Sequence, residues 1–284
     1  MSKIAVVTDS TAYIPTELVQ KYNITVAPQV LIWDDKTYRD GIDIKSAEFF
    51  ERLKTSKTMA TTSQVSVADM QNIFQGFAEE GYDVMGMFLS AKLSGTIQSA
   101  LQAKELMGSA GEKVTVFDSN STAMAMGFQV LSVARAAQDG ANTKDCIALA
   151  EKARESTGVY FAVETLEFLH RGGRIGGASR FLGTLLNLKP ILAVQDGKVE
   201  GLEQIRTKGK ALERVLELVV ENTKGKTPIR LATLHANAPE EAKVLLQKAE
   251  KELNPTESIF SEISPVVANH AGPGTVGLAY MAGM

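Results

Sequence analysis

The sequence has little cysteine and no long apolar run, and each shortage excludes a class of protein. A single cysteine, Cys146, excludes an intrachain disulfide and a metal site built from several thiolates. No apolar run approaches the ~18 residues of a membrane-spanning helix, and the run near Met1 is too short for a signal peptide. The net charge is -3 and the sequence has no dominant basic stripe, and both observations argue against nucleic acid as a partner. We therefore expect a cytoplasmic globular protein.

Several catalytic and nucleotide-binding motifs are also missing. Residues 225–227 resemble the end of a P-loop, but Val220 stands where its first glycine belongs. Residues 272–277 match G-x-G-x-x-G, yet too little chain follows for the strand–helix–strand unit that this dinucleotide motif needs. The histidines are widely separated: His170, His235 and His270. Since H-E-x-x-H and G-x-S-x-G are absent as well, we expect no metal and no cofactor.

Short apolar runs alternate with helical patterns in the first part of the chain. The predicted strands are residues 4–7, 84–89 and 114–117, and the predicted helices are residues 46–54, 67–79, 96–107, 123–138 and 143–155. Continuous apolar strands separated by helices are typical of a parallel sheet that is covered on both faces. We therefore expect a three-layer α/β/α domain with a parallel sheet over residues 1–160.

After about residue 158 the order of strands and helices becomes mixed. The predicted strands are residues 159–163, 191–195, 198–205, 229–234 and 275–280, and the predicted helices are residues 210–221 and 239–253. Asp196 and Gly197 predict the two-residue turn of a β-hairpin. Residues 161–284 are therefore expected to form a two-layer α/β domain with a mixed sheet.

Hydroxyl side chains cluster at three predicted strand-to-helix junctions of the first domain. These junctions are residues 8–11, 61–64 and 90–96. Ligands bind at the carboxyl ends of parallel strands, and the free N–H groups at a helix N-terminus favour an anion. Serine and threonine are also common helix caps, so a single junction fits either role. Three such junctions in one domain favour an anion site.

Two features of the second domain also allow both a functional and an ordinary interpretation. His270 lies on a tight glycine-rich turn next to an apolar run, so it fits a ligand-binding histidine or an ordinary buried one. Arg171 and Arg174 belong to a Gly/Arg-rich segment, with Arg180 and Arg206 further on. These arginines fit a patch for phosphate or an acidic partner, or a solvated loop.

Five short motifs resemble those of the DegV family in their order and spacing. They are Thr-Asp-Ser-Thr-Ala at 8–12, Thr-Ser-Gln at 62–64, Leu-Ser-Gly-Thr at 93–96, Leu-Glu-Phe-Leu-His-Arg-Gly-Gly-Arg-Ile at 166–175 and His-x-Gly-Pro-Gly at 270–274. The resemblance covers nearly the whole chain. It implies a bacterial two-domain α/β protein that binds a long-chain fatty acid such as palmitate or oleate.

The resemblance also implies a role and a set of site residues. Some members of the family are carrier subunits, whose bound carboxylate an ATP-dependent fatty acid kinase phosphorylates. Transient contact with a membrane-associated acyltransferase fits that role. The implied carboxylate-binding residues are Thr62, Ser94 and His270, with Ser63, Gly95 and Thr96 beside them. No catalytic residue is implied for the chain itself, which would be a carrier and not an enzyme.

The implied partner surface contains Arg171 and, less directly, Arg206. Two departures from the family pattern affect these expectations. Val65 and Val67 stand where the family often has proline, which can loosen the start of the helix beside Thr62. His170 stands where the family often has lysine, so the implied partner surface departs from the family pattern at this residue.

The chemistry of a carboxylate site agrees with the implied residues. Hydroxyl and backbone N–H donors hold a carboxylate, and we expect no lysine or arginine beside it, which leaves an oxygen free for phosphoryl transfer. One alternative is an acyl-ester hydrolase, in which His270 activates Ser94 and Asp9 or Asp118 orients the imidazole. Another alternative is a regulatory protein that a lipid merely stabilises.

Overall fold

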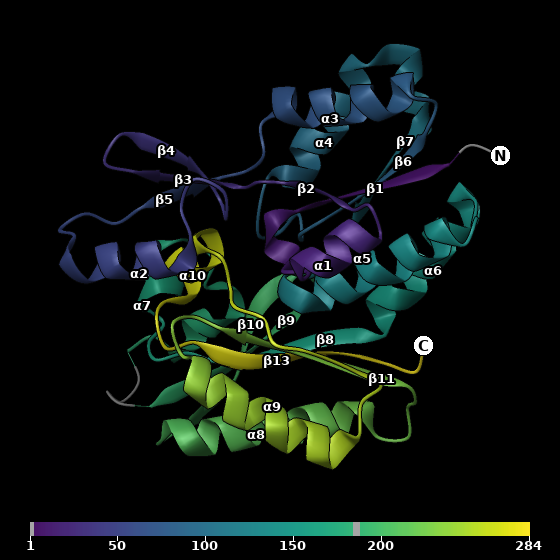
Figure 1. Ribbon diagram of the computed structural model, residues 1–284. Helices are drawn as coiled ribbons and strands as arrows, with labels where there is room; N and C mark the ends of the chain where they lie inside the picture. The colour runs from purple at the N-terminus through teal and green to yellow at the C-terminus, as the bar shows by residue number, and fades with distance from the viewer. Residues whose placement is uncertain (1–2, 184–187) are drawn as a thin grey trace.

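Sheets and helical layers alternate through the molecule in the computed structural model, which describes residues 3–183 and 188–284 (Figure 1). The helices α3 (Val67–Glu79) and α4 (Thr96–Leu106) cover the outer face of the first sheet. A middle layer of α1 (Thr16–Lys21), α5 (Ala123–Gln138) and α6 (Thr143–Glu155) follows. The second sheet comes next, and α8 (Lys208–Thr223) and α9 (Pro239–Leu253) form the last layer.

The first sheet is wholly parallel. Its strand order is β2 (Thr25–Ala27), β1 (Ile4–Asp9), β6 (Asp83–Phe88) and β7 (Val114–Asp118). The continuous apolar character of β1 and β6 follows from burial on both faces, as predicted from the sequence. This confirms the three-layer α/β/α arrangement.

The second sheet is mixed. Its order is β10 (Lys198–Ile205), β9 (Lys189–Gln195), β8 (Thr157–Ala162), β13 (Val276–Ala282), β11 (Ile229–His235) and β12 (Glu257–Ile259). The β11–β12 pair is parallel and the other pairs are antiparallel. Since α8 and α9 cover one face, the two-layer second domain with a mixed sheet is confirmed.

Helix α5 lies between the two sheets and contacts β1 on one side and β8 and β13 on the other. Nearly every residue of its first half is buried, because apolar side chains occur all around the helix. Gly127 permits a close approach, since a Cβ there would lie 2.5 Å from the carbonyl oxygen of Ala12. The domain boundary near residue 160 stays a prediction.

A small antiparallel sheet, which the sequence did not predict, lies beside the main layers. Its strand order is β4 (Lys36–Arg39), β3 (Val30–Trp33) and β5 (Thr61–Ser63). Three short helices lie near this sheet: α2 (Ser46–Thr55), α7 (Glu167–Arg171) and α10 (Pro265–Ala271). The remaining short helices are η1 (Ser10–Ala12), η2 (Gly108–Lys113) and η3 (Gly176–Phe181). No helix within the described residues is long and apolar enough to cross a membrane.

Candidate functional site

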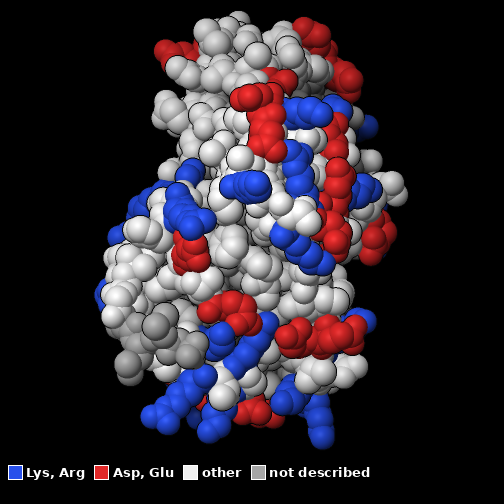
Figure 2. Space-filling model, turned by 90° about the vertical axis from the view of Figure 1, so that its left-hand side faces the viewer, with Lys and Arg blue, Asp and Glu red and all other residues white. Residues whose placement is uncertain are grey.

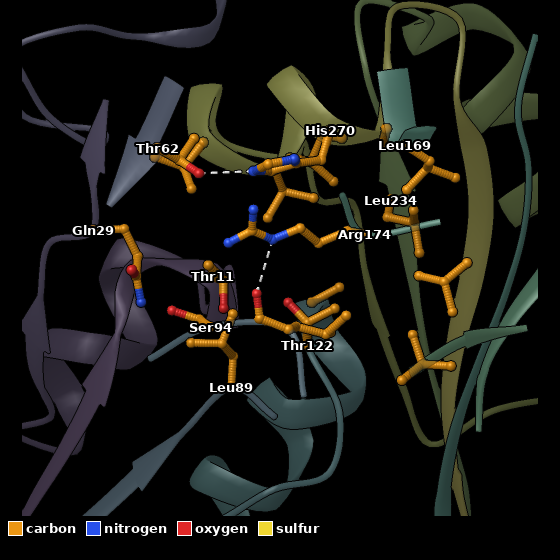
Figure 3. Close-up of a pocket in the computed structure, with 18 of the residues that line it drawn as sticks. Thr11, Gln29, Thr62, Leu89, Ser94, Thr122, Leu169, Arg174, Leu234 and His270 are labelled. Atoms are coloured by element: carbon orange, nitrogen blue, oxygen red, sulfur yellow. Dashed lines mark hydrogen bonds between the residues drawn. The ribbon is translucent and has the colours of Figure 1, made fainter. Parts of the chain in front are cut away.

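A cavity with an empty volume of about 870 Å³ lies between the two domains, and both contribute to its wall. Much of the wall is apolar, and it includes Leu89, Val159, Phe161, Leu169, Val194 and Leu234. Polar side chains gather in another part of the wall: Thr11, Gln29, Thr62, Ser94, Arg174 and His270 (Figure 3). The cavity therefore suits an elongated ligand with one polar end.

Thr62 and His270 meet in the polar part of this cavity. The Oγ1 atom of Thr62 lies 2.8 Å from Nε2 of His270. Thr62 belongs to β5 of the small sheet, so its predicted place at the start of a helix was wrong: the next helix, α3, begins at Val67. His270 lies in the last turn of α10, before the glycine-rich turn that was expected to carry it.

The imidazole of His270 is neutral at physiological pH. Burial, and to a lesser degree the positive charge of Arg174, lowers the pKa of His270 to about 4. Within the described residues, its buried Nδ1 atom has no hydrogen-bond partner. A buried N–H without an acceptor is rarer than a buried acceptor without a donor, so we assign the proton to Nε2. His270 then donates to Thr62, whose hydroxyl proton is left to face the cavity.

Ser94 approaches the cavity from the start of α4. Its Oγ lies 3.0 Å from Oγ1 of Thr96 and accepts a hydrogen bond of 3.3 Å from the backbone N–H of Thr96. The amide of Gln29 donates to Oγ1 of Thr96 at 2.8 Å, and Gln29 also lines the cavity. The hydroxyl of Ser94 therefore belongs to a polar chain at a helix N-terminus, where free N–H groups favour an anion.

The adjacent residues of the two motifs have different environments. Ser63 is exposed but reaches the cavity wall, while Thr96 is fully buried in the first turn of α4. Gly95 is the residue before α4, and a Cβ there would lie 3.0 Å from Cδ of Gln64. Gly95 thus lets the amide of Gln64 pack closely against the loop that carries Ser94.

Arg174 lines the cavity, although the sequence suggested a surface loop or a partner contact. Its Nε donates to the carbonyl oxygen of Leu93 at 3.1 Å, and one terminal nitrogen donates to that of Gly172 at 2.7 Å. Figure 3 shows the guanidinium group projecting into the space bounded by Thr62, His270 and Ser94. The expectation that no arginine lies beside the carboxylate site was therefore wrong, because hydrogen bonds to the carbonyl groups of distant Leu93 and nearby Gly172 hold this side chain inward.

The two arginines of the implied partner surface, Arg171 and Arg206, lie on the outside of the molecule. Arg171, the last residue of α7, is exposed and forms a salt bridge of 2.5 Å with Glu167. Arg206 is exposed just after β10. Neither lines the cavity, so the structure separates them from Arg174. Within the described residues, no three metal-ligating side chains form a cluster.

Sequence and structure comparisons give closely similar relatives across nearly the whole chain. Residues 3–283 match the family model described as "Uncharacterised protein, DegV family". A DegV domain-containing protein of Halalkalibacterium halodurans is 34% identical over 281 residues, which are 99% of each chain.

Two solved structures have the same fold. One is described as fatty acid binding of a DegV family protein from Thermus thermophilus, with a TM-score of 0.93, 35% identity and 99% of both chains covered. The other is DegV, a fatty acid binding protein from Bacillus subtilis, with a TM-score of 0.90, 33% identity, and 99% of this chain and 100% of that one covered. The chain belongs to the DegV family.

Proposed function

We propose that the cavity binds one long-chain fatty acid, with the carboxylate at the polar end and the tail among the apolar walls. The observation that carries this proposal is that Thr62, Ser94 and His270, from three separate segments, line one cavity whose other walls are apolar. The fatty acid binding described for the Thermus thermophilus and Bacillus subtilis relatives supports it.

The polar end supplies both donors and charge for a carboxylate. Thr62 and Ser94 each have a hydroxyl that can donate, and His270 fixes the hydroxyl of Thr62 by donating to it. Each such donor contributes on the order of 1 kcal/mol to binding. Arg174 adds a positive charge that attracts the carboxylate, and a charge-assisted hydrogen bond is stronger than a neutral one.

The tail supplies most of the affinity. Burial of each methylene contributes about 0.8 kcal/mol, so a chain of about 16 carbons such as palmitate offers on the order of 10 kcal/mol before the costs of binding. Palmitate and oleate both fit this description, because neither requires a polar group in the apolar part of the cavity.

We further propose that the chain presents the bound carboxylate to an ATP-dependent fatty acid kinase and passes the acyl phosphate on by transient contact with a membrane-associated acyltransferase. The chain has no P-loop, so a partner would have to bring the ATP. The face with α2, α7 and the small sheet carries Lys and Arg interspersed with Asp and Glu (Figure 2). Arg171 and Arg206 are exposed, so both are accessible to such a partner in the cytoplasm.

The hydrolase alternative has less support from the geometry. A nucleophilic serine needs an imidazole to take its proton and an acid to orient that imidazole. Here Nε2 of His270 faces Thr62, and the hydroxyl of Ser94 faces Thr96. Within the described residues Nδ1 of His270 has no partner, so no carboxylate orients the ring. The arrangement favours a binding site over a Ser/His nucleophile.

Mass spectrometry of the purified protein tests the proposal. Organic extraction of the denatured protein should release about one free fatty acid for each chain, without any being added. Leu234→Trp, which fills the apolar part of the cavity, should lower this yield, whereas Val244→Trp at an exposed position of α9 should leave it unchanged. No fatty acid in the extract and no binding of added palmitate or oleate would refute the proposal, and an acyl adduct on Ser94 would favour the hydrolase.

A further inference from the structure

Helix α10, which carries His270, has a cap from a distant part of the chain. The residue before the helix, Ser264, has the extended backbone of an N-cap, but its side chain makes no capping hydrogen bond. Instead, the backbone N–H of Val266 donates to Oδ1 of Asp40 at 3.1 Å, across 226 residues of sequence. A carboxylate at this position satisfies a free N–H group and interacts favourably with the helix dipole.

Asp40 is buried and is held in place by hydroxyl groups. It is 2% exposed, and its Oδ2 accepts a hydrogen bond of 2.6 Å from the hydroxyl of Ser10. The hydroxyl of Ser264 also faces this carboxylate, and it lies 3.3 Å from the hydroxyl of Tyr13. Within the described residues Asp40 forms no salt bridge. The carboxylate is thus fixed relative to β1 and η1, on the side of the first sheet.

The ionisation of Asp40 is compatible with a capping role. Burial raises the pKa of Asp40, hydrogen bonds from Ser10, Ser264 and Val266 oppose the rise, and the nearby charge of Asp9 adds to it, so that the pKa is about 6. The carboxylate is therefore mainly ionised at neutral pH. Tyr13 beside it stays neutral, since burial raises its pKa well above the usual range.

The rest of α10 lies along the segment that carries Thr62. The side-chain amide of Asn269 donates to the carbonyl oxygen of Ala60 at 3.1 Å, and the next residue, His270, contacts Thr62. A helix of seven residues has little stability of its own. Its position must therefore depend on these contacts and on the cap at its first turn.

We propose that Asp40 is a positioning residue of the site: by capping α10, it holds the helix where Nε2 of His270 meets Thr62. Its consequence for ligand binding rests on the fatty acid function proposed above, whereas its effect on His270 needs no ligand. Asp40 itself lies outside the set of residues that line the cavity.

Nuclear magnetic resonance of the histidine side chains tests this role directly, because the chain has only three histidines. In the ligand-free protein, His270 should show a single neutral form with the proton on Nε2. Asp40→Ala should raise the pKa of His270 from about 4 toward its ordinary 6.5 and mix the two neutral forms, since the ring gains access to water. Asp40→Asn should keep the wild-type signals, because its amide oxygen still accepts from Val266.

Two internal controls separate positioning from general damage. Asp43→Asn removes a nearby exposed carboxylate that pairs with Arg39, and it should leave His270 unchanged. His235, buried at the end of β11, reports whether the second domain is folded. If Asp40→Ala does not fold, Asp40→Ser serves in its place, because the shorter hydroxyl is polar but does not reach Val266.

The outcomes distinguish this inference from the proposed function. A folded Asp40→Ala or Asp40→Ser protein with unchanged His270 signals overturns the positioning role, as does an Asp40→Asn protein that behaves like Asp40→Ala. Fatty acid affinity should fall about tenfold in Asp40→Ala and stay within about twofold of wild type in Asp40→Asn. Altered His270 signals in a protein that binds no fatty acid at all would support the positioning role and refute the proposed function.

Discussion

The Oγ1 atom of Thr62 and the Nε2 atom of His270 lie 2.8 Å apart, although 208 residues separate them in the chain. Thr62 comes from the small sheet attached to the first domain, and His270 from a short helix of the second domain. Their hydrogen bond therefore joins the two domains at the polar end of the cavity. It also fixes the direction in which the hydroxyl proton of Thr62 points, so the pair acts as one donor group toward a ligand.

Removal of the Thr62 hydroxyl should weaken fatty acid binding. Thr62→Val keeps the shape of the side chain but removes a carboxylate donor worth on the order of 1 kcal/mol, so the affinity for oleate should fall roughly three- to tenfold. The control is Thr61→Val, an exposed neighbour whose side chain points to the opposite face of β5. Displacement of a fluorescent fatty acid measures both. An equal loss in the two variants would contradict the role given to Thr62.

Gly172 should be intolerant of a methyl group for a reason that concerns His270. A Cβ at Gly172 would overlap with Nδ1 of the imidazole, while its backbone φ of -76° is acceptable to alanine. Gly172→Ala should therefore displace the ring and lower fatty acid affinity about tenfold or more. Gly76→Ala, in α3 with open space around it, should bind normally and be slightly more stable. Unchanged binding by Gly172→Ala would show that the position of the ring does not matter.

The two arginines of the Gly/Arg-rich segment should have separable effects. Arg174→Ala removes the guanidinium group from the cavity, so fatty acid affinity should fall about tenfold and the pKa of His270 should rise. Arg171→Ala should leave affinity unchanged, because its side chain is exposed and pairs with Glu167, but it should lower phosphorylation by a cognate kinase. Loss of fatty acid binding in a folded Arg171→Ala protein would contradict this division.

The pH dependence of stability should contain two opposing contributions. The pKa of Asp40 is raised to about 6. The stability that its protonated form contributes is therefore fully present below the ordinary pKa of 3.8 and is lost as the pH rises through about 6. The pKa of His270 is lowered to about 4, so its contribution is present above its ordinary 6.5 and is lost as the pH falls toward about 4. Between about pH 4 and pH 6 the two effects partly cancel.

Single substitutions should expose each contribution. In Asp40→Asn the effect of His270 remains alone, so the free energy of unfolding should fall more steeply than in wild type as the pH drops from about 6.5 to 4.5. The difference should be on the order of 1–3 kcal/mol. His270→Gln should change the slope in the opposite direction. Urea denaturation across this pH range measures the free energy of unfolding of the wild type and both variants. Parallel plots of this free energy against pH for all three proteins would rule out the two pKa shifts.

The parts of the fold that the sequence predicted are those with a strong local pattern. The helices α3 (Val67–Glu79), α5 (Ala123–Gln138), α6 (Thr143–Glu155) and α9 (Pro239–Leu253) have the predicted bounds, because their apolar periodicity extends over several turns. The small sheet was missed because β5 has only three residues, all polar, and it gains its strand geometry by pairing with distant β3. Helix α10 was missed since seven residues are too few for a periodic pattern.

The candidate site was predictable to a similar degree. Thr62, Ser94 and His270 were found through motif resemblance, and the structure brings all three to one cavity. Arg174 was not assigned to it, because a Gly/Arg-rich sequence is also typical of a solvated loop. Its inward direction depends on carbonyl groups, one of them at Leu93 in the other domain, and no local pattern encodes such a contact. Asp40 was missed for the same reason.

Crystal structures of the protein prepared with and without added oleate test the central claim most directly. We predict that the carboxylate oxygens lie within hydrogen-bond distance, about 2.6–3.2 Å, of donors from Thr62 and Ser94, with the imidazole of His270 in contact with the same group. The tail should follow the apolar wall past Phe161 and Leu234. An oleate bound with its carboxylate away from these side chains, or a cavity that stays without oleate at saturating concentration, would contradict the account.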